Sequence, residues 1–257
     1  MRDYRMTLAY DGTGYSGWQV QPGRVTVQEK IEWALREITG QPVRVVASGR
    51  TDAGVHAVGQ VVSFRCRTRL ESPVLRQALE ANTPEDIHIR HVEVAPAGFH
   101  AIRDAISKRY RYVIQDGLER DPFRRAYSWY IPRALDVGSM RRAAGLLTGR
   151  HDFRSFQASG SPRQSSIRTI STLDVARTKH EFAQSIMIEI EADGFLYNMV
   201  RNIVGSLVLV GRGRETVEWV GRVLAAGDRA QAGPTAPARG LTLWNVRYRG
   251  DEESAAP

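Results

Sequence analysis

The residues with the clearest potential for chemistry lie in segment 48–57, which reads Ser-Gly-Arg-Thr-Asp-Ala-Gly-Val-His-Ala. One carboxylate, Asp52, stands there among small residues, and the guanidinium of Arg50 precedes it by two positions. Strand-like runs at 43–47 and 58–64 flank the segment, so a glycine-containing turn can hold the acid out from a sheet edge and into a cleft. Loops on rigid scaffolds commonly carry catalytic groups. The alternative, which is the more common role at this spacing, is that Asp52 caps a turn through its own backbone.

A second candidate is Arg201, which lies in a mostly apolar run at 196–210 between Val200 and Ile203. A buried guanidinium needs an anionic partner, because an unpaired charge in an apolar environment is costly. Asp52 is a candidate partner, and a nearby cation would keep that carboxylate ionised. The alternative is that the Arg201 side chain extends to solvent.

A third candidate is segment 108–112, Lys-Arg-Tyr-Arg-Tyr, in which cations alternate with aromatics. In a strand, period two puts Tyr110 and Tyr112 on one face and Arg109 and Arg111 on the other. A tyrosine face is by default part of a core. An aromatic beside a basic surface can instead stack on an extruded base, which contributes about 1–3 kcal/mol.

Two other classes of site do not fit the sequence. The pattern Gly12-x-Gly14-x-x-Gly17 matches a dinucleotide fingerprint, but residues 18–23 separate it from the next helix, whose start would have to hold the pyrophosphate. The six histidines are scattered, and no His/Cys spacing suits zinc. His56 is close to Asp52 in sequence, and we expect it to pack in the turn.

The charge balance favours a polyanionic partner. The 257 residues include 36 Lys and Arg against 28 Asp and Glu, and only three of the basic residues are lysines. Arginine suits bidentate phosphate recognition, although a genome rich in G and C would also raise its content. Residues 103–177 hold 14 Arg and one Lys against seven acids, so the rest of the chain is close to neutral. This concentration indicates a nucleic-acid surface, the alternative being a merely solvated face.

Other features bound the class of protein. The single cysteine, Cys66, excludes an intrachain disulfide and fits a reducing cytosol. The first residues are polar and resemble no signal peptide. The longest apolar stretch, 203–210, is too short to span a bilayer, so we expect a cytoplasmic protein with no membrane role.

Strands and helices interleave along the chain. Helix starts are marked by a capping box of Thr26 with Glu29, by Ser72 before Pro73 and by Asp136. We expect helices from 26 to 40, from 72 onward, and at 136–149, 196–210 and 215–226. We expect strands at 6–10, 43–47, 58–64, 87–94, 108–115, 182–192 and 241–248, and a mobile basic loop at 157–168. This order predicts an α+β fold with a mainly antiparallel sheet.

In combination these motifs resemble the tRNA pseudouridine synthase A (TruA) family along nearly the whole chain. The first half carries the matches 10–21 (Tyr-Asp-Gly-x-x-Tyr-x-Gly-Trp-Gln-x-Gln), 26–28 (Thr-Val-Gln) with Glu32, 48–57 and 59–62 (Gly-Gln-Val-Val). The second half carries 109–112, 151–153 (His-Asp-Phe), 194–196 (Gly-Phe-Leu), 199–205 (Met-Val-Arg-Asn-Ile-Val-Gly) and 236–241 (Ala-Pro-x-x-Gly-Leu). Asn198 stands where many relatives have histidine.

The resemblance implies a pseudouridine synthase fold, α+β, in which two α/β halves share a mainly antiparallel mixed sheet with flanking helices. The half at 1–104 would carry the nucleophile loop, and the half at 105–257 would carry the basic RNA-binding region and the partner arginine. The implied function is isomerisation of uridine to pseudouridine at positions 38, 39 and 40 of the tRNA anticodon stem-loop. The implied enzyme is a homodimer that uses no cofactor and no metal.

The resemblance also assigns roles to single residues. Asp52 is similar to the family's nucleophile, and Arg201 to the basic residue that pairs with it. Tyr110 is similar to the aromatic that contacts the target base, and Arg50 to the arginine that holds the extruded nucleotide or its vacated place. We assign Arg109 and Arg111, beside Tyr110, to substrate binding as well.

The implied reaction breaks the glycosidic bond at N1, rotates the base and joins C5 to the ribose. One carboxylate can support it by attack at C1′, by attack at C6 or by removal of a sugar proton, and the residues leave these routes open. A non-catalytic RNA-binding module would explain the charge but not an acid set against a polyanion. A glycoside hydrolase would need two carboxylates around one bond, and a phospho-aspartate enzyme would need Mg²⁺ ligands.

Overall fold

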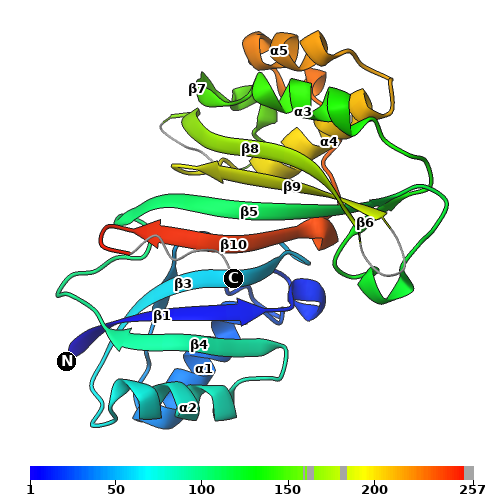
Figure 1. The fold of residues 1–257 in the computed structure, drawn as a ribbon. Helices are drawn as coiled ribbons and strands as arrows, with labels where there is room; N and C mark the ends of the chain where they lie inside the picture. The colour runs from blue at the N-terminus through cyan, green and yellow to red at the C-terminus, as the bar shows by residue number, and fades with distance from the viewer. Residues whose placement is uncertain (159, 161–164, 180–183, 252–257) are drawn as a thin grey trace. The chain divides into compact units, whose positions relative to one another are not determined.

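A computed structural model describes residues 1–158, 160, 165–179 and 184–251 (Figure 1). The chain divides into two compact units. The first comprises Met1–Ile106 together with Thr242–Pro257, and the second comprises Ser107–Leu241. The described residues form ten strands and five α-helices, and both units contain strands as well as helices.

The strands of the first unit are arranged around β1 (Arg2–Tyr10). It pairs antiparallel with β3 (His56–Cys66) and with β4 (Ile87–Val94). The short β2 (Val45–Ala47) pairs antiparallel with β3, and β10 (Leu241–Tyr248) pairs parallel with β3. Alternate side chains of β1 are buried, from Tyr4 to Tyr10, because period two sends them to the same face.

Two helices complete the first unit. In α1 (Val27–Thr39), the Thr26 hydroxyl accepts the N–H of Glu29 at 3.4 Å, and Gly40 ends the helix in the left-handed conformation. In α2 (Ser72–Asn82), Glu71 is the N-cap and Ser72 is already helical, one residue earlier than we expected. Figure 1 shows both helices on the same side of β1, β3 and β4.

In the second unit, four strands follow one another as antiparallel neighbours. They are β5 (Ala105–Asp116), β9 (Gln184–Ala192), β8 (Ile167–Lys179) and β7 (Gly149–Asp152). The short β6 (Trp129–Ile131) pairs parallel with β5. Parallel pairs beside antiparallel ones in both units confirm the α+β class with mainly antiparallel, mixed strand pairing.

Three helices belong to the second unit, α3 (Val137–Gly145), α4 (Met199–Gly211) and α5 (Val217–Ala226). Helix α4 is apolar on nearly all sides and is buried along most of its length, as such a helix must be. The segment before β10 packs against it, because Gly233 N–H donates to the Ser206 hydroxyl at 2.9 Å and Ala236 N–H donates to the Arg201 carbonyl at 3.1 Å.

Several elements differ from the expected ones, among them the unexpected strand β6, and three larger differences lie in the second unit. Helix α3 ends at Gly145 rather than at 149, because 149–152 pairs with β8 as β7. The 13-residue strand β8 was not expected, and a bulge between Ile170 and Thr172 interrupts its alternation. Of the expected loop at 157–168, residues 159 and 161–164 lie outside the described residues, and 167–168 begin β8.

The expected halves, 1–104 and 105–257, differ from the two compact units at the end of the chain. We expected the closing strand to lie in the second half, but β10 from Thr242 onward belongs to the first unit. The reason is its pairing with β3, in which Thr242 lies opposite His56 and Leu243 opposite Ala57.

Candidate active site

The loop that carries Asp52 connects β2 to β3, and buried hydrogen bonds fix its beginning. Ser48 N–H donates to the Val61 carbonyl at 2.8 Å, and the Ser48 hydroxyl donates to Gln60 Oε1 at 2.8 Å. Gln60 Nε2 in turn donates to the Gly49 carbonyl at 2.8 Å. Ser48 and Gln60 are both buried, so the loop leaves β2 along a defined path.

Tyr10 fixes the residue directly before Asp52. Its hydroxyl lies 2.8 Å from Thr51 Oγ1 and also accepts from Gln60 Nε2 at 3.4 Å. Burial raises the pKa of Tyr10 to about 12, because the phenolate would lose its hydration. Tyr10 is therefore a neutral hydrogen-bonding group near pH 7, and it links β1 to the loop.

The turn at Asp52 is closed by its main chain. Val55 N–H donates to the Asp52 carbonyl at 3.1 Å, and Gly54 adopts φ +76°, the conformation that the third position of a type II turn requires. Asp52 itself is half-buried, whereas Arg50 and Ala53 on either side are exposed. The acid thus lies at the boundary between a fixed backbone and accessible space.

The glycine-rich segment after β1 supports this turn from the other side. Trp18 N–H donates to the Thr51 carbonyl at 3.0 Å. Gly17 has φ +89°, and a Cβ there would lie 2.7 Å from the Thr51 carbonyl oxygen and 3.1 Å from the carbonyl carbon of Asp52. The pattern that resembled a dinucleotide fingerprint is therefore a packing surface for the Asp52 loop.

His56 packs in the turn, as we expected. It is buried, and its Nδ1 accepts the Gly12 N–H at 3.1 Å and lies 3.0 Å from Asp11 Oδ1. These contacts attach the start of β3 to the segment that follows β1.

In the second unit, Tyr110 lies at the middle of β5 and is buried. Its ring meets that of Phe195 edge-on, with centroids 5.1 Å apart. Phe195 belongs to the 194–196 motif, so the structure brings together two segments of the resemblance that are far apart in sequence. Such an aromatic pair can form one wall of a site for a planar base.

Arg109 and Arg111, on the other face of β5, form ion pairs with the neighbouring strand β9. Arg109 donates to Glu191 at 2.6 and 2.8 Å and lies 3.1 Å from Glu189, which also accepts from Arg111 Nε at 2.6 Å. Glu191 raises the pKa of Arg109 further. These pairs hold β5 in register with β9. Substrate binding by the two arginines stays a prediction, and the pairs favour a positioning role.

Arg201 lies in the first turn of α4 and is half-buried. Its Nε donates to the Ala236 carbonyl at 2.7 Å, and its Nη1 donates to Asn198 Oδ1 at 2.9 Å. Asn198 adopts the left-handed conformation at the N-cap, with φ +57°. Two neutral acceptors thus orient the guanidinium. Its pairing with Asp52, which belongs to the first unit, stays a prediction.

Sequence reasoning did not identify Tyr10 and Gln60 as supports of the Asp52 loop, or Glu189 and Glu191 as partners of the arginines. The signals were present, since Tyr10 and Gln60 both fall in motifs of the resemblance, and period two places the glutamates on one face of their strand. In the described parts of the chain, no group of three or more His, Cys, Asp or Glu side chains could hold a metal ion. None of the described helices has both the length and the apolar character that crossing a bilayer requires.

Comparison with known proteins agrees with these motifs. A family model described as tRNA pseudouridine synthase matches residues 6–102 and 143–249, which include Asp52 and Arg201. Three similar proteins are each named tRNA pseudouridine synthase A. That of Moorella thermoacetica is 49% identical over 249 residues, covering 95% of this chain and 98% of the relative. Those of Brevibacillus brevis and Geotalea uraniireducens are 45% and 42% identical over 248 residues, covering 96% of this chain and 100% of each relative. On this similarity, which runs through both compact units, the chain belongs to the tRNA pseudouridine synthase A family of tRNA-modifying isomerases.

Proposed function

We propose that this enzyme converts uridine to pseudouridine at positions 38, 39 and 40 of the tRNA anticodon stem-loop, with Asp52 as the nucleophile. The observation that carries the proposal is the support of the Asp52 loop. Ser48, Gly49 and Thr51 are each fixed by hydrogen bonds, while Asp52 remains partly accessible. A rigid backbone that presents an accessible carboxylate suits covalent attack on a bound nucleotide.

The reaction is an isomerisation and balances within the nucleotide. The N1–C1′ bond breaks, a C5–C1′ bond forms, C5 loses its proton and N1 gains one. No electrons are exchanged, so the chemistry requires no redox cofactor, and in this proposal it proceeds without a metal. Attack at C1′, attack at C6 and removal of a sugar proton would all begin at the same carboxylate.

The other residues pair with the Asp52 carboxylate, contact the base or hold the extruded nucleotide. Arg201 pairs with the Asp52 carboxylate, and the ring of Tyr110, oriented by Phe195, contacts the base. Arg50, exposed beside the nucleophile, holds the extruded nucleotide or fills its place in the stem, since a paired base must leave its stack at a cost of a few kcal/mol. We expect the enzyme to act in the cytoplasm as a homodimer.

The test is Asp52→Asn, assayed by tritium release from tRNA labelled at uridine C5. We expect turnover to fall roughly 10³-fold or more while the Kd for tRNA stays within about twofold, because the amide keeps the shape but loses the nucleophile. Glu85→Gln is the matched control, since it removes one exposed carboxylate from the same unit. Normal tritium release from Asp52→Asn would refute the role of Asp52, and loss of tRNA binding without a change in kcat would assign Asp52 to binding rather than to catalysis.

A further inference from the structure

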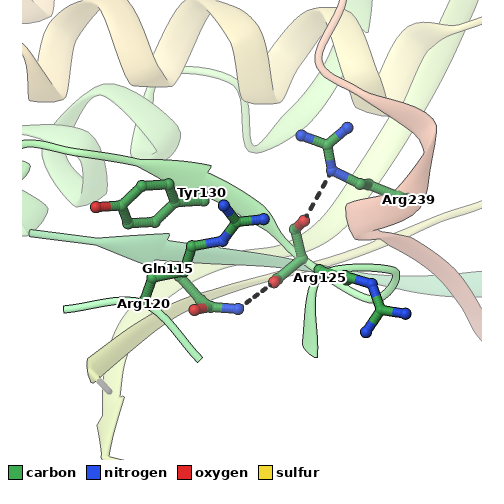
Figure 2. Close-up of a pocket in the computed structure, with 6 residues that line it drawn as sticks. Gln115, Arg120, Arg125, Tyr130 and Arg239 are labelled. Carbon is green, nitrogen blue, oxygen red and sulfur yellow. Dashed lines mark hydrogen bonds between the residues drawn. The ribbon is translucent and has the colours of Figure 1, made fainter. Parts of the chain in front are cut away.

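Figure 2 shows a pocket of about 290 Å³ in the second unit, whose lining includes none of the residues assigned to base chemistry. Its lining comprises Gln115, Arg120, Arg125, Ser128, Tyr130 and Arg239. Gln115 follows Tyr110 by five residues on β5, which corresponds to about 17 Å of extended strand. Five of the six lining residues also fall between the two segments that match the family model.

The floor of the pocket is neutral, and its polar groups bond to one another. Gln115 Nε2 donates to Ser128 Oγ at 2.6 Å and to the Asp121 carbonyl at 3.3 Å, and its Oε1 accepts the Asp121 N–H at 2.7 Å. The Ser128 hydroxyl donates to the Arg124 carbonyl at 2.7 Å. Gln115 and Ser128 are buried, so these bonds fix the 117–128 loop to the end of β5 and preform the pocket.

Three guanidinium groups from separate segments surround this floor. Arg120 lies over the ring of Tyr130, 5.4 Å from its centroid, and Arg239 Nε donates to the Ser128 carbonyl at 3.1 Å, as Figure 2 shows. Arg125 follows the short helix Pro122–Arg124 and donates to the Pro122 carbonyl at 3.2 Å. All three arginines are exposed, so their charges face solvent at the mouth of the pocket.

The two buried carboxylates of this segment, Asp116 and Asp121, form their hydrogen bonds and ion pairs with groups other than the three pocket arginines. Asp116 accepts from both terminal nitrogens of Arg177, at 2.7 and 3.0 Å. Asp121 accepts the Phe123 N–H at 2.9 Å and lies 4.0 Å from Arg124. Within the described ranges, neither Arg120 nor Arg125 forms an ion pair, and Glu119 beside them is exposed. The pocket therefore has an excess of positive charge around a rigid, neutral floor.

We propose that this pocket binds a backbone phosphate of the tRNA at a point away from the target nucleotide. Guanidinium groups match phosphate oxygens in bidentate geometry, and a tetrahedral anion can accept from several of them at once. Contacts of this kind fix the register of an RNA without reading its sequence. The tRNA substrate of the family supplies the phosphate. The proposal rests on that substrate and not on the role of Asp52.

The test compares Arg120→Gln/Arg125→Gln with the matched control Arg214→Gln/Arg222→Gln, which removes two exposed arginines elsewhere in the same unit. For the pocket variant we expect the Kd for tRNA to rise about tenfold and the slope of log Kd against log salt to decrease by about one, because a phosphate contact and its counterion release are lost. The control should stay within about twofold of wild type, and kcat at saturating tRNA should be unchanged in both.

Further measurements separate the sources of the anion. Arg120→Lys/Arg125→Lys keeps the charge and should keep the salt slope while binding tRNA more weakly than wild type. Titration with inorganic phosphate detects a site for a free anion. Wild-type tRNA binding by Arg120→Gln/Arg125→Gln would overturn the proposal. This holds even if that variant loses binding of inorganic phosphate or loses self-association. Failure of Asp52→Asn to block turnover would leave this result unaffected, because here tRNA affinity is measured.

Discussion

At the scale of single residues, one support of the Asp52 loop is the phenol of Tyr10. Tyr10 and Tyr4 both lie in β1 and are both buried, but their hydroxyls differ. The Tyr10 hydroxyl bonds to Thr51 and Gln60, whereas the Tyr4 hydroxyl has no hydrogen-bond partner in the portion of the chain that the structure describes. The two side chains are therefore a natural matched pair.

We expect Tyr10→Phe to lower the free energy of unfolding by about 1–2 kcal/mol, because it leaves buried polar partners unsatisfied. It should also lower kcat about ten- to hundredfold, since Thr51 can then move with Asp52. Tyr4→Phe should change neither quantity appreciably, because it removes an unpaired hydroxyl. Urea unfolding and tritium release measure both. Equal stability of the two variants would contradict the role of Tyr10.

The residues of the site were predictable to different degrees. The Asp52 loop was recognisable because its acid, glycines and flanking strands are contiguous in sequence. Its supports were not, because Tyr10 lies 41 residues from Thr51 and 50 residues from Gln60. The pairing of Arg109 with Glu191, 82 residues away, likewise depends on strand register that local patterns do not specify.

At the scale of elements, the turn at Asp52 and the segment after β1 are packed backbone against backbone. Gly17 lies at their contact with a positive φ, whereas Gly14, three residues earlier, has nothing within 4 Å of its Cβ position. Comparing substitutions at these two glycines therefore distinguishes an effect on the position of the Asp52 loop from the effect of any added side chain in this segment.

We expect Gly17→Ala to reduce kcat at least tenfold, because its methyl group would meet the Thr51 carbonyl at 2.7 Å and push the loop away. The left-handed backbone adds about 1–2 kcal/mol of strain. Gly14→Ala should retain wild-type activity. Single-turnover kinetics at saturating tRNA would measure both. Wild-type turnover by Gly17→Ala would show that the loop position does not limit the reaction.

Element boundaries were predictable where one residue determines them. Thr26 and Asp136 cap α1 and α3 through the expected side-chain oxygens, and Gly40 ends α1. Strand β8 was missed because its bulge breaks the alternation of apolar residues between Ile170 and Leu173. The end of α3 was missed because strand pairing with β8 takes over at Gly149.

At the scale of the whole molecule, the first and last segments of the chain meet inside the first unit. Arg5 Nη1 and Nη2 donate to the two carboxylate oxygens of Asp251 at 2.7 and 2.9 Å, and the Tyr248 N–H donates to the same carboxylate at 2.9 Å. Burial alone would raise the pKa of Asp251, but hydrogen bonds from Arg5 and Tyr248 lower it below its ordinary value.

We expect Asp251→Asn to destabilise the protein by about 1 kcal/mol at pH 7, a modest value because both side chains are partly exposed. A carboxyl whose pKa is lower in the folded state stabilises the fold above its unfolded pKa of about 3.9, and this contribution is lost as the pH falls through the folded value. The stability difference should therefore vanish in acid. Unfolding by urea from pH 7 to 2 measures it, and a difference that persists at pH 2 would refute the ion pair.

The first unit contains two segments that are far apart in sequence, so its folding depends on the order in which the chain is translated. The ribosome delivers the contiguous second unit before β10 emerges. Until then, His56 and Ala57 of β3, which directly follow the Asp52 loop, lack the strand that pairs with them. In the nascent chain, the Asp52 loop therefore lies beside an open strand edge, which is prone to mispairing, until β10 has emerged and paired with β3.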